Sequence, residues 1–161
     1  MARKRNRSRL SGAAAALVAN ERVCRVGTAN PEGQPHLVPV CHVVAGGKLY
    51  IGSGEDATKV RNVRANPRVT VTVDLYSEYW AELKGVMVQG TAKVIERGPV
   101  FQRARKKLYE KYPQYPKEAA LSPSDSVILE ITPTHVFSWG PGGYEDRLQL
   151  VGGRPGEANE S

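Results

Sequence analysis

The sequence has few of the residues that mark secreted, disulfide-bonded or membrane-spanning proteins. Its 161 residues include only two cysteines, Cys24 and Cys41, which cannot form the disulfide framework of a small secreted domain. No apolar run reaches the roughly 18 residues that a membrane-spanning helix requires. The short stretch Ala13–Ala19 follows a basic opening, but no convincing signal-peptide cleavage pattern accompanies it. We therefore expect a cytoplasmic protein with reduced thiols and no membrane contact.

The usual nucleotide-binding and metal-binding motifs are also missing. Neither a P-loop nor a Gly-x-Gly-x-x-Gly fingerprint occurs, and the cysteines and histidines lack ligand spacing such as Cys-x-x-Cys. Cys41 and His42 are adjacent, so we expect their side chains to point to opposite faces of a strand. We predict no metal site. We also assign no catalytic residue, because neither thiol has an evident base and orienting group.

Basic residues outnumber acidic ones, but they are unevenly distributed. The chain has 23 Lys and Arg against 16 Asp and Glu, a net charge of +7, and a pI of about 9.6. Residues 1–9 carry five bases and no acid, whereas residues 10–140 carry 16 bases and 12 acids. We predict a disordered basic arm over 1–10, one globular domain over 11–140 and a flexible tail over 141–161. Nucleic-acid binding through the arm is an alternative function, although we do not expect nucleic acid to be the main partner.

Alternating apolar residues and turn signals predict a mainly β protein. Pro35 and Pro39 lie inside one expected strand, which must therefore be an edge strand or contain a bulge. Gly85 and Gly90 mark close approaches or bends in another. Because the strands are mostly consecutive, we expect an antiparallel barrel or sandwich with helices at its ends. The six expected strands are 23–29, 34–44, 48–53, 69–74, 84–96 and 126–139, and the expected helices are 11–21, 56–66 and 99–112.

The segment Gly52–Arg68 carries the strongest sign of a ligand. A strand ends at its glycines, Asp56 is the expected helix N-cap, and Lys59 then falls in the first helical turn. The helix dipole disfavours a lysine there by a few tenths to about 1 kcal/mol. A bound anion would reverse that penalty, because free N–H groups and cations together form a phosphate site.

Other residues of this segment fit the same interpretation. Arg61 adds a second cation, and the hydroxyls of Thr58 and Ser53 add hydrogen-bond donors. The alternative is that one of the two acidic residues just before the helix neutralises Lys59 locally. From the residues alone, both interpretations stay open.

Several parts of the chain resemble a known family. Residues 25–40 resemble the opening hairpin of the pyridoxamine 5′-phosphate oxidase-like flavin-binding split barrels, and residues 58–69 resemble their phosphate-binding helix and following strand. Residues 74–80, 112–115 and 138–139 look like the subgroup usually described as probable F420-dependent enzymes. The order and spacing of these motifs carry the resemblance, which covers about residues 15–140.

The resemblance implies a six-stranded antiparallel split β-barrel of the FMN-binding type that forms a homodimer. FMN or the deazaflavin F420 would lie in two equivalent clefts at the dimer interface. The cofactor phosphate would be contacted by Lys59, with four residues around it: Thr58, Ser53, Gly52 and Arg61. The isoalloxazine-type ring would be lined by Val38, Pro39 and Val40, while Trp139 would border the ring or the substrate cleft. A position near this cleft is left open for His36 or His42.

Two departures from the oxidase argue against vitamin B6 oxidation. Thr58 stands where the oxidase has a basic residue, and Gly85 stands where it has a glutamine. We therefore predict an F420- or FMN-dependent oxidoreductase that transfers a hydride between its cofactor and an unidentified small organic substrate. The alternative is a non-catalytic binding or storage protein for FMN, F420 or a tetrapyrrole.

An aromatic group and a basic helix have two interpretations each. Tyr76, Tyr79 and Trp80 could stack on a substrate or a base, but we prefer packing in the dimer interface, where aromatic residues are enriched. The basic run between Arg103 and Lys111 could recognise an acidic cofactor tail or nucleic acid, but such runs are usually solvated faces.

Overall fold

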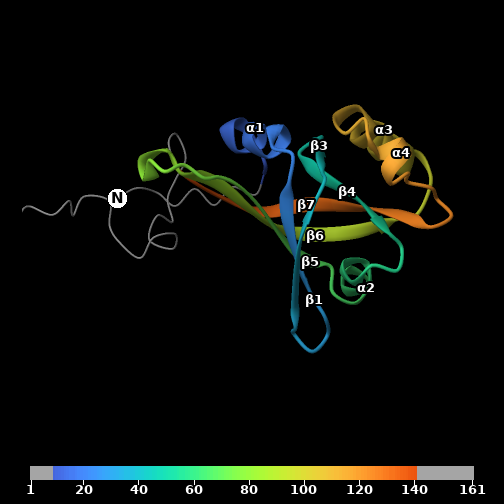
Figure 1. Ribbon diagram of the computed structural model, residues 1–161. Coiled ribbons are helices and arrows are strands. Elements are labelled where there is room, and N and C mark those ends of the chain that lie inside the picture. Colours follow the sequence, from blue (N-terminus) through green and yellow to red (C-terminus); the bar gives the residue numbers. More distant parts are fainter. Residues whose placement is uncertain (1–8, 141–161) are drawn as a thin grey trace, which may run out of the picture.

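The computed structural model describes residues 9–140. They form one antiparallel sheet with the strand order β2-β1-β5-β6-β7-β4-β3, which curls into a half-open barrel (Figure 1). The strands are β1 (Cys24–Ala29), β2 (Pro35–Val40), β3 (Val43–Ala45), β4 (Lys48–Gly54), β5 (Arg68–Leu75), β6 (Lys84–Ile95) and β7 (Ser126–Trp139). The helices are α1 (Gly12–Asn20), α2 (Thr58–Ala65), α3 (Pro99–Lys111) and α4 (Tyr115–Glu118), with a 3-10 turn, η1 (Trp80–Glu82). The prediction of an antiparallel, mainly β fold with flanking helices is confirmed.

Two helices close the curled sheet from opposite sides. Figure 1 shows α1 above the sheet and α2 below it. Val18 of α1 and Val60 of α2 are buried in the same core as Val71 and Val88 of the sheet. The helices α3 and α4 lie beside α1, where α3 covers a second, smaller cluster around Phe101. Fully burying a side chain of this kind contributes about 1.5–3 kcal/mol, so these contacts fix where α2 lies.

The single strand predicted over residues 34–44 is wrong, because the structure has two strands there and seven in the sheet instead of six. The break falls at Cys41 and His42. There the main-chain N–H of His42 donates to the Tyr112 hydroxyl (3.1 Å), and that hydroxyl donates to the His42 carbonyl (3.0 Å). A tyrosine from the end of α3 thus takes the place of a neighbouring strand. The expected alternation of Cys41 and His42 across a strand therefore does not apply.

The prolines and glycines lie where their backbone chemistry requires. β2 is an edge strand with β1 as its only neighbour, so Pro35 and Pro39 fit as predicted. Gly90 is a close approach, because a Cβ there would collide with the Thr132 carbonyl. The register between β6 and β7 shifts at this point, between Gln89 and Gly90.

The boundary of the domain differs from the prediction at one residue. Leu10, which we assigned to the basic arm, is buried in the main core. The rest of the arm up to residue 8 and the tail over 141–161 lie outside the described residues. Their expected disorder, and any role in nucleic-acid binding, stay predictions. Between residues 9 and 140 no helix has both the length and the apolar character needed to cross a membrane.

Candidate functional site

α2 begins shortly after the end of β4, and this junction sets the position of its first turn. The Glu55 N–H donates to the Asp125 carbonyl (2.9 Å), which holds the chain as it leaves the sheet. The N-cap is Ala57, not Asp56 as predicted, and no side chain caps the helix. Because the helix starts one residue later than expected, the exposed carboxylate of Asp56 does not accept from its first N–H groups. These amides are left for another acceptor.

Lys59 occupies the second position of α2 and is half-buried. Burial lowers the pKa of its ammonium. None of the three ion pairs among residues 9–140 includes Lys59, so the proposed neutralisation by an acidic neighbour does not occur there. A half-buried cation without a partner gains more from a bound anion than an exposed cation does, because the surrounding medium screens it less.

Arg61 and Thr58 complete the start of α2. The Arg61 guanidinium folds back over the first turn, where it donates to the Asp56 carbonyl and to Thr58 Oγ1 (3.2 Å). The backbone amides of Thr58 and Lys59 have no acceptor in the described part of the chain. Two cations, one hydroxyl and two unpaired amides therefore gather at one helix start, a donor set that suits a phosphate.

Ser53 and Gly52 precede this helix start but face different ways. Ser53 is buried on the core side of β4, and its hydroxyl donates to the Gly54 carbonyl (3.1 Å). Gly52 lies on the other side of the strand under Leu121, whose side chain would be 2.7 Å from an added Cβ. The Ser53 hydroxyl is thus already bonded within its own strand, and Gly52 serves the packing of Leu121.

The three predicted ring-lining residues lie on β2 and alternate across it. Val38 and Val40 pack against the main core, and Pro39 is exposed on the opposite side. This strand belongs to the hairpin that extends beside α2 in Figure 1. β2, which carries Val38, Pro39 and Val40, therefore lies beside the helix that carries Lys59. Of these three residues, Pro39 faces outward.

Polar residues that the sequence did not single out link α2 to the β1–β2 hairpin. Asn62 Nδ2 donates to Thr28 Oγ1 (3.0 Å), and both side chains are buried. Thr28 lies opposite His36 in the hairpin, and the buried His36 Nδ1 has no hydrogen-bond partner among the described residues. His42 lies elsewhere, between α1 and the end of α3, with Nε2 2.5 Å from the Val18 carbonyl. In the sequence, the signal for this link is Asn62, a polar residue on the otherwise apolar side of α2.

Trp139 lies at the opposite end of the sheet from α2. β7 starts at Ser126, opposite Gly54 of β4, and ends at Trp139, opposite Gly85 of β6. With a rise of about 3.3 Å per residue, the two ends of this strand are roughly 40 Å apart. The Trp139 indole covers the bare backbone of Gly85, where a Cβ would collide with it. Within one chain, the structure does not bring Trp139 to Lys59.

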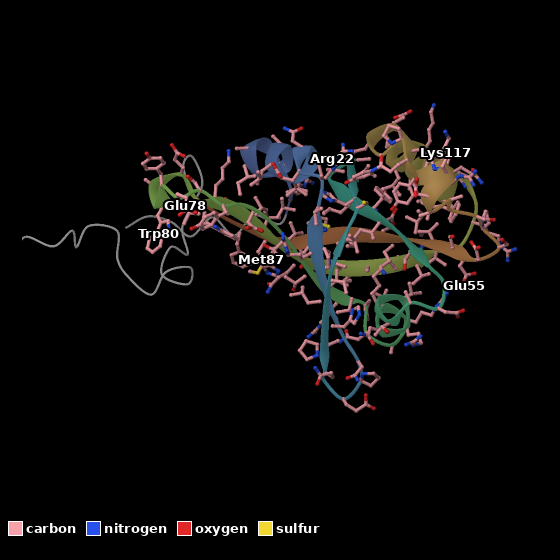
Figure 2. All side chains as sticks on the ribbon, in the orientation of Figure 1. Arg22, Glu55, Glu78, Trp80, Met87 and Lys117 are labelled. Carbon is pink, nitrogen blue, oxygen red and sulfur yellow. The ribbon has the colours of Figure 1, made fainter. Side chains whose placement is uncertain are left out.

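One side of the sheet carries exposed apolar side chains. Leu37 is 66% exposed and Phe137 is 37% exposed, and Figure 2 shows Met87 on the side away from α1. The strand pairing places Pro39, Met87 and Phe137 in a single row across five strands. Arg25 and Thr72 lie in the same row between Pro39 and Met87, so polar side chains interrupt the apolar ones. Exposed apolar side chains that gather on one side of a sheet mark a candidate site of interaction. We call it the outer face, made of Leu37, Pro39, Met87, Phe137 and Trp139.

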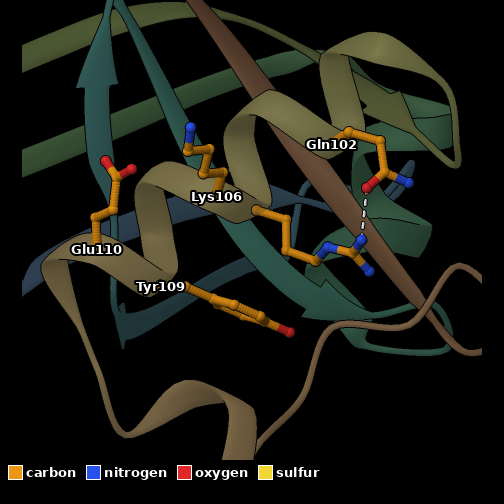
Figure 3. Close-up of a pocket in the computed structure, with 5 residues that line it drawn as sticks. Gln102, Lys106, Tyr109 and Glu110 are labelled. Carbon is orange, nitrogen blue, oxygen red and sulfur yellow. Dashed lines mark hydrogen bonds between the residues drawn. The ribbon is translucent and has the colours of Figure 1, made fainter.

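A hollow on the surface of α3 is separate from all these groups (Figure 3). It is lined by Gln102, Arg105, Lys106, Tyr109 and Glu110. The Arg105 guanidinium is already occupied, because it donates to Gln102 Oε1 (2.5 Å) and to the Leu121 carbonyl (3.0 Å). No predicted site residue lines this hollow. The described residues also contain no group of three or more His, Cys, Asp or Glu arranged to hold a metal ion.

Comparison with known proteins gives a sequence family and a set of similar folds. Residues 10–140 match the family described as pyridoxamine 5′-phosphate oxidase. No curated protein matches the chain.

Three solved structures illustrate the range of the fold. The conserved hypothetical protein Rv2991 from Mycobacterium tuberculosis is 23% identical, with a TM-score of 0.70 over 86% of this chain and 90% of that one. An F420 reductase is 22% identical, with a TM-score of 0.61 over 75% of this chain and 93% of that one. HutZ, a heme storage protein from Vibrio cholerae, is 14% identical, with a TM-score of 0.69 over 84% and 96%. At these identities the likeness shows a shared fold.

Proposed function

The chain belongs to the pyridoxamine 5′-phosphate oxidase family of split barrels, and from this premise we propose that it is a flavin- or deazaflavin-dependent oxidoreductase. It transfers a hydride between FMN or F420 and a small organic substrate. The two free thiols suit a reducing, cytoplasmic setting for this chemistry. The similar fold of an F420 reductase supports the proposal at the level of architecture.

The observation that carries the proposal is the half-buried Lys59, which has no acidic partner within residues 9–140. It lies at a helix start with unpaired amides and with Arg61 and Thr58 beside it. FMN and F420 both carry a phosphate, so the same donors hold either one. When bound, the cofactor supplies the hydride chemistry, while these residues anchor its phosphate.

We propose that the working form is a homodimer with the cofactor at the interface. The outer face exposes Leu37 and Phe137 beside polar side chains, a mixed surface that suits association with a second copy. Lys59 and Trp139 lie at opposite ends of one chain, so they meet on a common ligand only when Trp139 comes from the partner subunit. Pro39 lies on the exposed side of β2, where it lines the ring and excludes water, while Val38 packs against the core on the opposite side of the strand.

A second candidate is a non-catalytic carrier of FMN, F420 or a tetrapyrrole. The α2 site offers two cations and hydrogen-bond donors that could hold a ligand, and no catalytic residue has been assigned beside them. The fold is shared with a heme storage protein. Hydride transfer from the reduced cofactor to an acceptor separates the enzyme from the carrier.

The proposed site is tested by titrating the purified full chain with FMN and with F420. Binding is measured through the fluorescence of the cofactor. We expect at least one of them to bind, and Lys59→Ala to weaken it by about 10- to 100-fold through loss of a charge-assisted contact. Lys117→Ala removes an exposed lysine of α4 and is the matched control, with unchanged affinity expected. Absence of binding by both cofactors, or equal affinity in the two variants, would reject the site.

A further inference from the structure

The residues between β5 and β6 form a well-held turn that exposes three aromatic rings. Tyr76, Tyr79 and Trp80 are 68%, 77% and 63% exposed. The turn is held by its own hydrogen bonds: Ser77 Oγ donates to Glu82 (3.0 Å) and accepts from the Tyr79 N–H (3.1 Å). We call residues 76–82 the aromatic turn. Exposing large apolar rings on a fixed support costs solvation free energy unless something covers them.

The aromatic turn lies at the end of the sheet opposite α2. Asp74 just before it pairs with Gly85, which pairs with Trp139, so the turn and Trp139 share one end. Figure 2 shows Trp80 and Glu55, the latter just before α2, at opposite ends of the molecule. The rings therefore cannot reach the cofactor phosphate site of their own chain.

The two ends also differ in the charges that they leave unpaired. In the aromatic turn, Glu78 and Glu82 have no ion-pair partner among residues 9–140, whereas Asp74 is paired with Arg25. In and just after α2, Lys59, Arg61 and Arg68 have no ion-pair partner in that part of the chain, although the exposed Glu55 and Asp56 precede the helix. In a two-fold symmetric pair, each surface patch of one copy contacts the matching patch of the other in reverse order. Two outer faces paired in this way bring each acidic aromatic end against a basic α2 end, an electrostatically complementary arrangement.

We propose that the aromatic turn of one protomer completes the cofactor cleft of its partner and stacks a planar, conjugated substrate against the cofactor ring. The inference rests on the proposed homodimeric cofactor site and adds the residues and substrate class that it lacks. Trp80 and Tyr79 are positioning residues for the substrate, since flat aromatic rings favour stacked, planar partners. The other interpretation, that the rings only pack the interface, becomes an outcome of the test.

The first test measures where Trp80 lies relative to the bound cofactor. The chain has two tryptophans, Trp80 and Trp139, so Trp139→Phe leaves Trp80 as the only indole. Saturating this variant with FMN or F420 is expected to quench more than half of the indole emission, because energy transfer falls steeply with distance. A Trp80→Phe/Trp139→Phe variant gives the background. Binding is monitored independently through the cofactor's own fluorescence. If the cofactor binds but Trp80 emission is not quenched, the inference is overturned and the proposed function is left intact. Cofactor binding is first established with the unchanged chain, because Trp139 itself is proposed to border the ring. Absence of binding there overturns both.

The second test asks whether the turn selects the substrate. Menadione is the planar probe: the reduced cofactor gives up a hydride, and menadione with one proton from water becomes the hydroquinone. Tyr79→Ala/Trp80→Ala is expected to raise KM for menadione by about tenfold while kcat, measured with the cofactor saturating, changes little. Tyr79→Phe/Trp80→Phe keeps two rings and is expected to restore KM. An unchanged KM together with a shift from dimer to monomer in sedimentation assigns the rings to the interface alone and overturns the substrate role.

Discussion

The two ends of the curled sheet differ in charge, burial and hydrogen bonding. At the α2 end, polar groups are drawn inward: Lys59 is half-buried, and Asn62 bonds Thr28 inside the structure. At the other end, aromatic groups are turned outward, as Trp80 is 63% exposed and Trp139 covers a glycine backbone. One end has donors for a phosphate and no aromatic platform, and the other has rings and no comparable cation.

Neither end alone makes a complete site for the proposed cofactor. A phosphate-bearing, planar cofactor needs both a cationic anchor and a flat surface. Since roughly 40 Å of β7 separates the ends, one chain cannot offer both to one ligand. A cofactor of the kind proposed for this family would therefore take its anchor from one copy of the chain and its flat surface from another. Perturbing the core and then each end in turn tests this arrangement.

The largest loss in the free energy of unfolding is expected on acidification. It should arise at His42 in the core and not at either end of the sheet. His42 is fully buried, and burial lowers its pKa from 6.5 to about 4. Its Nε2 lies 2.5 Å from the Val18 carbonyl and its Nδ1 has no partner among residues 9–140, so a second proton has no acceptor. The unfolded chain binds this proton near pH 6.5 and the folded chain only near pH 4. Stability is therefore full above pH 6.5 and falls by about 3 kcal/mol as the pH drops to 4.

Urea unfolding between pH 7 and pH 4 measures this loss. His42→Gln keeps a side-chain donor without a titrating ring, so the part of the pH slope that belongs to His42 should vanish. His135→Gln changes an exposed histidine and is the matched control, with the slope retained. An unchanged slope in His42→Gln would show that the acid loss arises elsewhere.

The second perturbation breaks the aromatic end. Gly85→Val places side-chain atoms where the Trp139 indole lies, so the indole must move. We expect a loss of about 2 kcal/mol in the free energy of unfolding, as for other overpacked sites. In a Trp80→Phe background, the Trp139 emission should shift to longer wavelength as the ring becomes solvated. Gly54→Ala is the control, since no atom lies within 4 Å of a Cβ added there. Equal free energies of unfolding for the two variants would show that packing of the Trp139 indole does not require a glycine at position 85.

The sequence predicted local features of both ends and missed those that depend on distant residues. Alternating valines and flanking glycines located β5 and β6, and the bounds of β7 agree with the prediction residue for residue. The place of Lys59 in a first helical turn was also predicted correctly. These features follow from neighbours in the chain, which propensity and periodicity report.

The missed features join residues far apart in the chain. The break between β2 and β3 depends on the Tyr112 hydroxyl, 70 positions from His42. The separation of Lys59 from Trp139 depends on how β4, β6 and β7 pair, which no local pattern encodes. Helix starts are also set by such contacts: the Glu55 bond to Asp125 shifted the N-cap of α2 by one residue from the prediction.

The smallest effect is expected at the α2 end, where a single buried hydrogen bond ties the helix to the hairpin. Asn62→Ala leaves the Thr28 hydroxyl buried without its donor, and we expect a loss of about 1 kcal/mol in the free energy of unfolding. Thr28→Val should cost a similar amount by leaving the Asn62 amide unpaired. Combined in Asn62→Ala/Thr28→Val, the same two changes remove both polar groups, so the loss should be smaller than the sum of the singles. Strict additivity in urea unfolding would contradict a direct bond. Because this bond fixes the helix that carries Lys59, the single variants should also weaken cofactor binding, whereas Gly85→Val should leave phosphate anchoring unchanged.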